Sequence, residues 1–266
     1  MSGHGHVVVD NFLKAWPGAL FFQTSTAFAT QLRARHAFRT TPIGIEPVVD
    51  VAGWSTRGAH KQTIRSAVNR ARATGITIAE DNDIDLASVS TTWLLTRRRR
   101  TLRFLVPPQE HRPLGARTFV ARDVDGDVLG FVTFDVLARG GAVVGYTPSV
   151  SRASTRFRPG LWYAIVADAL KVFQREGIAG VNLGLAPLAR DTFNASDDAD
   201  VGDAPLLRLA LRVLRSVGGV LYNFGGIEHA KARFEGHATR SWLCHRGALP
   251  VWSLFAVLWR TWRVPG

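Results

Sequence analysis

The chain has 266 residues, of which 46% are hydrophobic, so it is long enough to bury the core of one large or two small domains. Its net charge of +12 indicates a polyanionic partner, such as nucleic acid, anionic lipid headgroups or a phosphorylated cofactor. The single cysteine, Cys244, excludes an intrachain disulfide and fits a reducing compartment. Residues 1–10 lack the apolar run of a signal peptide, and no apolar stretch is long enough to span a bilayer.

The first 112 residues predict alternating helices and strands. Hydrophobic periodicity and turn residues separate the elements, and Gly75 stands where a helix C-terminal cap is expected. The predicted elements are a helix over 12–35 interrupted at Pro17-Gly18, a strand over 42–51, a helix over 55–74, a strand over 76–80 and a helix over 83–100.

Prolines at 107, 108 and 113 place the domain boundary near residue 112, which predicts domains 1–112 and 113–266. Asp125-Gly126 is a hairpin turn signal, and Gly177 ends a helix. The predicted elements are strands over 118–122, 128–134 and 142–146, a helix over 161–176, a strand over 179–185, a helix over 205–217, a strand over 220–224, a helix over 227–234, a strand over 240–244 and a terminal amphipathic helix over 250–264. This order resembles a GNAT-type acyltransferase domain, and the predicted fold class is α/β (α+β).

Three local sequences carry a more specific resemblance. One is Asn-Leu-Gly-Leu-Ala-Pro-Leu at 182–188, which follows a helix and a glycine turn. The second is Leu-Tyr-Asn-Phe-Gly-Gly-Ile at 221–227, which leads to Lys231, Arg233 and Phe234. The third is the helix Lys-Gln-Thr-Ile-Arg-Ser-Ala-Val-Asn-Arg at 61–70. Together they resemble the C-terminal domain family of lysylphosphatidylglycerol synthases.

The resemblance implies tandem GNAT-like halves around a shared cleft, with the active site in the C-terminal half. It also implies transfer of an aminoacyl group from aminoacyl-tRNA, the co-substrate, to a hydroxyl, typically of phosphatidylglycerol, without a further cofactor or metal. The chain departs from the family at Ser149-Val150-Ser151-Arg152, where Asp-Leu-Met-Arg is usual, and at Trp162-Tyr163, where an acid is common. The amino acid and the acceptor therefore stay open.

Exchange of an acyl group between esters needs an oriented hydroxyl, a proton acceptor and stabilisation of an oxyanion, but no nucleophilic residue. Lys231 is the first candidate, because a lysine can steer a phosphate or stabilise the oxyanion. The alternative for Lys231 is a salt bridge with Glu228 or Glu235 at helical spacing. Asn182 is expected to hydrogen-bond the aminoacyl group, and the alternative is that it satisfies backbone groups where strands diverge. Arg152 completes the predicted catalytic set.

A second predicted set binds the substrates. Asp168 and Glu228 are the candidates for the acid that recognises the α-ammonium group. The whole substrate-binding set is Arg158, Asp168, Glu228, Tyr222 and Arg233.

Basic residues at helical spacing predict contacts with tRNA or phosphate. These residues are Lys61, Arg65 and Arg72 on one helix and Arg208 and Arg212 on another. The alternative is a solvated basic face on the first helix and an ordinary surface helix with a leucine core face for the second. The terminal helix, with Trp252, Phe255, Trp259 and Trp262, predicts either peripheral membrane contact or packing on the core.

Three other functions stay open at the level of sequence. They are an aminoacyl-tRNA-dependent transferase with a small-molecule acceptor, an acyl-CoA-dependent N-acyltransferase and a non-catalytic module that binds tRNA or lipid. The stretch before Leu161 has one glycine, which counts against a coenzyme A pyrophosphate loop. The expected location is cytoplasmic, with peripheral contact at the inner face of the membrane as an option, and the sequence leaves the oligomeric state open.

Overall fold

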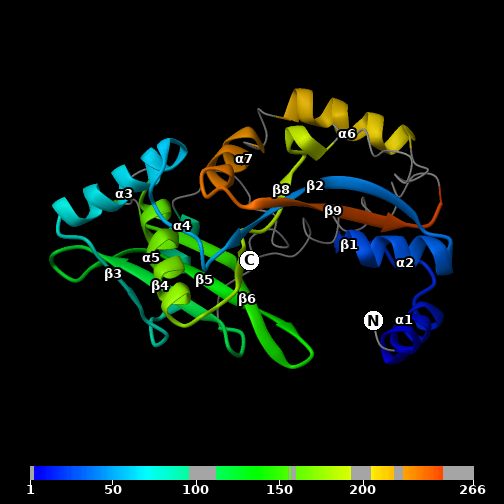
Figure 1. Cartoon of the computed structure of the whole chain (residues 1–266), viewed down its shortest axis with the longest axis horizontal. Helices are drawn as coiled ribbons and strands as arrows, with labels where there is room; N and C mark the ends of the chain where they lie inside the picture. The colour runs from blue at the N-terminus through cyan, green and yellow to red at the C-terminus, as the bar shows by residue number, and fades with distance from the viewer. Residues whose placement is uncertain are drawn as a thin grey trace. The chain divides into compact units, whose positions relative to one another are not determined.

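The computed structural model describes residues 3–95, 112–154, 156, 160–192, 205–218 and 224–247 (Figure 1). Nine strands and seven α-helices lie within these residues, which confirms the predicted α/β class. The predicted elements at 220–223 and 250–264 fall outside the described residues.

Contacts between Cα atoms divide the chain into two compact units. Unit 1 consists of Met1–Glu46, Leu185–Glu228 and Thr239–Arg260, and unit 2 of Pro47–Gly184, His229–Ala238 and Thr261–Gly266. Residue 112 lies within unit 2. The assignment of GNAT-like halves to 1–112 and 113–266 stays a prediction.

Unit 2 is a sheet covered by helices on both faces, with the strand order β2-β7-β6-β5-β4-β3. The strands are β2 (Arg39–Asp50), β3 (Thr77–Glu80), β4 (Arg117–Arg122), β5 (Val128–Arg139), β6 (Ala142–Ala153) and β7 (Gly180–Asn182). The helices are α3 (Gln62–Ala73), α4 (Leu86–Leu95) and α5 (Leu161–Arg175). Neighbouring strands are antiparallel except for β6 and β7, which are parallel.

Apolar side chains on both faces of this sheet hold the helices. On one face, the fully buried Phe173 of α5 stacks on Tyr146 of β6 with 4.6 Å between ring centroids. On the other face, Leu86 of α4 packs in a cluster with Phe131 and Val150. Consecutive residues of β5 such as Phe131 and Val132 are both buried but belong to different clusters, so this strand supplies both layers of core.

Unit 1 has the strand order β1-β9-β2, with β8 paired to β2. Its strands are β1 (Phe21–Ser25), β8 (Ala186–Pro187) and β9 (His237–His245), the last beginning in unit 2, together with the first part of β2. Its helices are α1 (Gly3–Ala15), α2 (Thr26–His36), α6 (Pro205–Gly218) and most of α7 (Phe224–Ala232). Leu32 of α2 and Trp242 share one apolar cluster, whereas Leu207 of α6 and Leu243 share another, so α2 and α6 cover opposite faces (Figure 1).

The predicted helix over 12–35 is wrong in its middle. Pro17 ends α1, because its ring cannot continue the helical hydrogen bonding, and β1 follows by pairing with β9. Ser25 then begins α2, accepting a hydrogen bond from the Phe28 amide on its side chain. The predicted helix over 55–74 begins later, at Gln62, after Gly58 with a φ of 102°.

Candidate active site

The two parallel strands of unit 2 separate soon after they meet. Their register contains only Gly145 opposite Gly180 and Tyr146 opposite Val181. A Cβ atom at Gly145 would lie 2.3 Å from the Gly180 carbonyl oxygen, so glycine is required for this close approach. Beyond the paired residues β6 continues to Ala153, whereas β7 ends two residues after Gly180. In open α/β sheets, ligands bind at such carboxyl ends of diverging strands.

The ammonium group of Lys231 lies beside this divergence. A Cβ atom at Gly184 would be 3.5 Å from Lys231 Nζ, 3.9 Å from Thr147 Oγ1 and 4.0 Å from the Pro148 carbonyl oxygen. Lys231 and the Asn182 segment, two separately predicted features, are therefore neighbours in space. The lysine brings a positive charge to the ends of β6 and β7.

Asn182 shapes the backbone next to Lys231. Its Oδ1 accepts a hydrogen bond of 2.8 Å from the Gly184 amide, and Gly184 has a φ of 77°. The Leu183 amide donates to the Pro47 carbonyl oxygen at 2.8 Å, which ties the turn to β2. The predicted hydrogen bond of Asn182 to an aminoacyl group stays a prediction. In this structure the side chain holds a turn whose glycine leaves room for Lys231.

An aromatic cluster anchors the segment that follows Lys231. Phe234 is fully buried, and its ring lies between those of Trp54, Trp162 and Tyr163, with centroid distances of 6.1, 5.7 and 6.0 Å. The Phe234 amide donates to the Lys231 carbonyl oxygen at 3.1 Å. Because Phe234 is three residues from Lys231, burial of its ring fixes the end of α7 and with it the backbone of the lysine.

Polar contacts attach the same segment to α3. Lys61 Nζ lies 2.8 Å from Glu235 Oε2, and its side chain is buried over the ring of Trp54. The hydrogen bond from Lys61 lowers the pKa of Glu235 below its ordinary value. Arg233 contacts the hydroxyl of Thr63, and one of its terminal nitrogens lies 2.8 Å from His229 Nε2. Lys61 and Arg233 thus join α3 to the segment that carries Lys231.

Arg152 lies on the arm of β6 that diverges from β7. It is buried and stands opposite Phe131 in the β5–β6 register, on the sheet face that α4 covers. Its guanidinium donates to the Ser151 carbonyl oxygen at 3.1 Å. The predicted catalytic role of Arg152 stays a prediction.

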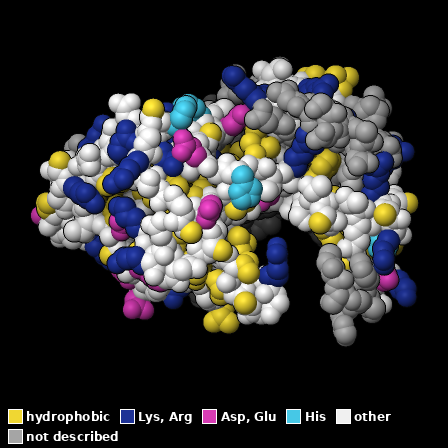
Figure 2. Space-filling view, viewed as in Figure 1, with side chains coloured by type: hydrophobic (Ala, Val, Ile, Leu, Met, Phe, Trp, Pro, Cys, Tyr) yellow, Lys and Arg dark blue, Asp and Glu magenta, His cyan; other side chains and the backbone are white. Residues whose placement is uncertain are grey.

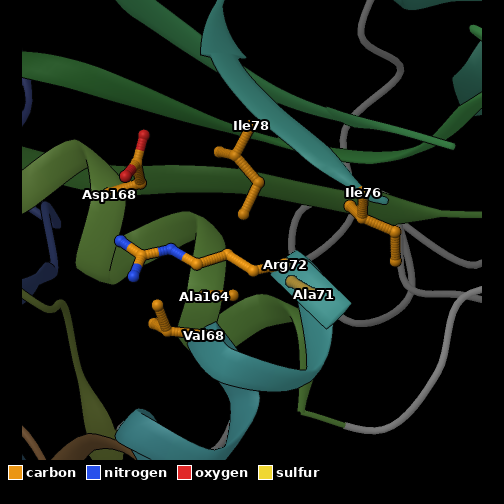
Figure 3. Close-up of a pocket in the computed structure, with 7 residues that line it drawn as sticks. All are labelled: Val68, Ala71, Arg72, Ile76, Ile78, Ala164 and Asp168. Atoms are coloured by element: carbon orange, nitrogen blue, oxygen red, sulfur yellow. The ribbon is translucent and has the colours of Figure 1, made fainter. Parts of the chain in front are cut away.

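A pocket of about 170 Å³ brings together two residues that were predicted for different partners. Arg72 of α3 and Asp168 of α5 line it beside apolar side chains (Figure 3). The other lining residues are Val68, Ala71, Ile76, Ile78 and Ala164. Asp168 also forms a 3.5 Å ion pair with Lys171. The pocket therefore combines one cation, one carboxylate and five apolar side chains.

The other predicted residues have local partners or lie outside the described residues. Arg65 donates to the carbonyl oxygens of Thr56 and Gly58, and therefore closes the loop before α3. In unit 1, Glu228 accepts a 2.9 Å hydrogen bond from the Arg190 amide and lies 3.9 Å from Arg215.

On α6, Arg208 is half-buried and Arg212 is exposed, and the helix packs on the core through Leu207 and Leu211. Arg158 and Tyr222 lie outside the described residues. The predicted binding roles of all these residues stay predictions.

Several features of the site were not predicted from the sequence. Gly145 was predicted only as part of a strand, Thr147 lies just beyond that predicted strand, and Phe234 was noted only as part of a motif. The signal for Gly184 was the Asn-Leu-Gly sequence itself, because an asparagine two residues before a backbone amide is typical of a tight side-chain-capped turn.

A comparison with protein families decides the identity of the fold. The profile described as phosphatidylglycerol lysyltransferase, C-terminal, matches residues 8–245. The chain belongs to this family. The resemblance stated from the sequence is thereby confirmed, and membership makes the chain a transferase of acyl or aminoacyl groups. A comparison with curated proteins finds no match.

Solved structures with the same fold include members of this family. L-PGS from Bacillus licheniformis has a TM-score of 0.68 at 18% identity, over 94% of this chain and 76% of the other. A C-terminal domain assigned to lysylphosphatidylglycerol synthetase from Agrobacterium fabrum has a TM-score of 0.72 at 23% identity, over 93% and 75%. FemX has a TM-score of 0.53 at 9% identity, over 94% and 78%. The GNAT-like fold is therefore confirmed.

Two searches of the described residues gave no site. None of their helices is both long and apolar enough to cross a bilayer. Within the same part of the chain, no three His, Cys, Asp or Glu side chains gather as metal ligands would. The expectation of no metal and no cofactor stays a prediction.

Proposed function

We propose that the chain transfers an aminoacyl group from aminoacyl-tRNA to a hydroxyl group of phosphatidylglycerol or a closely related lipid. The observation that carries this proposal is the ammonium group of Lys231 beside Gly184 at the divergence of β6 and β7. Membership of the phosphatidylglycerol lysyltransferase family supports the lipid acceptor.

The chemistry that this site supports is the exchange of one ester for another. The lipid hydroxyl oxygen bonds to the carbonyl carbon of the aminoacyl ester, and the bond from that carbon to the ribose oxygen breaks. The proton of the attacking hydroxyl ends on the ribose oxygen, so no proton is gained or lost overall. The intermediate carries a negative oxygen, and a preorganised cation such as Lys231 stabilises that charge more strongly than water does.

The fixed backbone on both sides of the Lys231 side chain supports a positioned charge rather than a flexible surface lysine. Phe234 fixes the backbone of the segment, and Asn182 fixes the turn that faces Nζ. A cation held in place before the reaction loses little free energy by reorganisation when the oxyanion forms. The phosphate of the lipid headgroup is a second anion that the same ammonium group can attract.

The excess of basic residues supports a polyanionic donor. Figure 2 shows Lys and Arg side chains dispersed over the face in view, in keeping with the net charge of +12. In unit 2, Arg72 is an exposed cation on α3. Contacts of this kind with tRNA phosphates raise affinity through counterion release, so binding should weaken steeply as salt rises.

The test uses purified protein and total tRNA charged with labelled amino acids, with and without phosphatidylglycerol vesicles. Label that enters the lipid fraction only when vesicles are present supports the proposal and identifies the amino acid. Label that leaves tRNA without entering lipid contradicts the lipid acceptor and supports a small-molecule acceptor. If tRNA stays charged throughout, the proposed donor is wrong, and a parallel reaction with labelled acyl-CoA tests the alternative donor.

A further inference from the structure

Helix α1 and the residue that follows it expose a stripe of large apolar side chains that the core of unit 1 does not use. Val8, Phe12 and Trp16 follow one another at four-residue spacing, and they are 68%, 44% and 65% exposed. Phe22 of β1 is 52% exposed. Leu13 of α1, by contrast, is buried in the apolar cluster with α2. The helix therefore has one apolar side for the core and a second that faces solvent.

The stripe borders an apolar pocket of about 210 Å³. Four residues of α1 and β1 line it, namely Val8, Val9, Phe12 and Phe21. The rings of Phe12 and Phe21 lie 5.8 Å apart and form part of its wall. A pocket lined by these side chains offers no hydrogen bond to a peptide or a sugar, but it can hold a run of methylene groups.

Two exposed basic residues lie near the end of α1. Lys14 in the last turn of α1 is exposed, and the exposed Arg246 donates to the Pro17 carbonyl oxygen at 3.0 Å. The acid on this helix, Asp10, lies 3.3 Å from His36 Nε2. An apolar aromatic stripe on a protein with a net charge of +12 complements an anionic bilayer, because tryptophan and phenylalanine enter the interface while lysine and arginine stay at the headgroups.

We infer that the surface formed by Val8, Phe12, Trp16 and Phe22 docks unit 1 on a bilayer that contains anionic lipid, with an acyl-chain segment in the adjoining pocket. This inference rests on the proposed lipid acceptor and adds the surface by which the protein reaches it. It assigns membrane contact to α1 and β1, in addition to the contact predicted for the terminal helix.

Sedimentation with vesicles tests the docking surface. The double variant Val8→Ser, Trp16→Ser removes the two most exposed members of the stripe and leaves the buried Leu13 in place. The matched control, Val143→Ser with Val144→Ser, removes two exposed apolar side chains from β6. We expect the stripe variant to bind phosphatidylglycerol vesicles about tenfold or more weakly and the control to bind as the wild type does.

Three outcomes overturn the inference. One is equal vesicle binding by the stripe variant and the wild type, and another is equal binding of the wild type to phosphatidylcholine and phosphatidylglycerol vesicles. The third is a loss of self-association in the variant, measured by light scattering, with vesicle binding unchanged, which would assign the stripe to a second copy of the chain. Unchanged far-ultraviolet circular dichroism of both double variants shows that they are folded.

The docking surface and the proposed function can fail separately. Monomeric short-chain phosphatidylglycerol needs no bilayer, so the stripe variant should transfer label to it at the wild-type rate. Failure of the wild type with this acceptor and with vesicles would contradict the proposed function, whatever the binding result. Loss of transfer by the stripe variant with both acceptors would overturn the docking role instead, because the damage would then lie in catalysis.

Discussion

Lys231 Nζ lies 3.5 Å from the place where a Cβ atom of residue 184 would be. Because Gly184 has no side chain, the ammonium group can lie against its backbone beside the ends of β6 and β7. The same glycine has a φ of 77°, which Asn182 supports through its hydrogen bond to the Gly184 amide. The Asn-Leu-Gly motif thus makes room for Lys231, which is distant from it in the sequence.

Replacing Gly184 by alanine should lower transfer activity more than it lowers stability. The positive φ costs about 1–2 kcal/mol for any residue with a Cβ atom. The added methyl group also occupies the space beside Lys231. Gly177→Ala is the control, because Gly177 has a φ of 73° but an added Cβ there meets nothing within 4 Å. Equal activity of the two variants at equal stability would contradict the role of Gly184 in the site.

Phe234→Ala should destabilise the protein by about 3–5 kcal/mol, because it empties a fully buried aromatic site. It should also reduce activity in the folded fraction, since the end of α7 loses its anchor. Phe119→Ala is the control, as Phe119 is fully buried in the same core cluster but lies on β4. Chemical denaturation and transfer assays at a temperature where both variants are folded separate the two effects. Equal transfer rates for the two variants would contradict a role of Phe234 in positioning Lys231.

Arg72 of α3 and Lys61, which directly precedes α3, should respond differently in tRNA binding. Arg72→Met should weaken binding and reduce the slope of log K against log salt by about one, as expected for loss of one phosphate contact. Lys61→Met should leave the slope unchanged, because Lys61 is buried and paired with Glu235. Filter binding of charged tRNA at several salt concentrations gives both slopes. A reduced slope for Lys61→Met alone would reverse this assignment.

His245 should make the protein less stable in mild acid. Burial lowers the pKa of this histidine below its ordinary value of 6.5. The unfolded chain therefore binds a proton at a higher pH than the folded chain does, so the free energy of unfolding falls as the pH drops below about 6.5.

His245→Phe tests that effect. His245 is buried, so an aromatic ring of similar size should cost little stability at pH 8. The variant should lose less stability between pH 7 and pH 5 than the wild type, as measured by urea denaturation. His237→Phe, at an exposed position on the same strand, should keep the wild-type dependence. An identical pH profile for His245→Phe would contradict the buried neutral state.

Hydrophobic periodicity predicted the long regular elements, because the pattern of apolar residues within each segment indicates which of its residues are buried. Strand β4 and helix α5 follow the predicted bounds closely, and the turn at Asp125-Gly126 joins β4 to β5 as predicted, but β5 continues to Arg139 instead of ending at residue 134. The strand β1 was missed, because its identity depends on pairing with β9, which lies more than 200 residues away. Local propensity does not contain that information.

The site was predicted in part for the same reason. Family motifs pointed to Asn182 and Lys231, and the structure brings their segments together. Sequence spacing could not show that Lys61 pairs with Glu235, since the two residues are far apart in the sequence. Sequence spacing also gave no sign that Arg72 and Asp168 share a pocket, because strands β3 to β6 separate α3 from α5 along the chain.

The central claim is that the positive charge of Lys231 supports aminoacyl transfer. Its most direct test is the single-turnover rate of label transfer from saturating charged tRNA to phosphatidylglycerol by Lys231→Ala, with Arg139→Ala as an exposed, charge-matched control. The account predicts a rate about 100-fold or more below wild type for Lys231→Ala, as for loss of one oxyanion-stabilising group, and a wild-type rate for the control. A wild-type rate for Lys231→Ala would contradict the account.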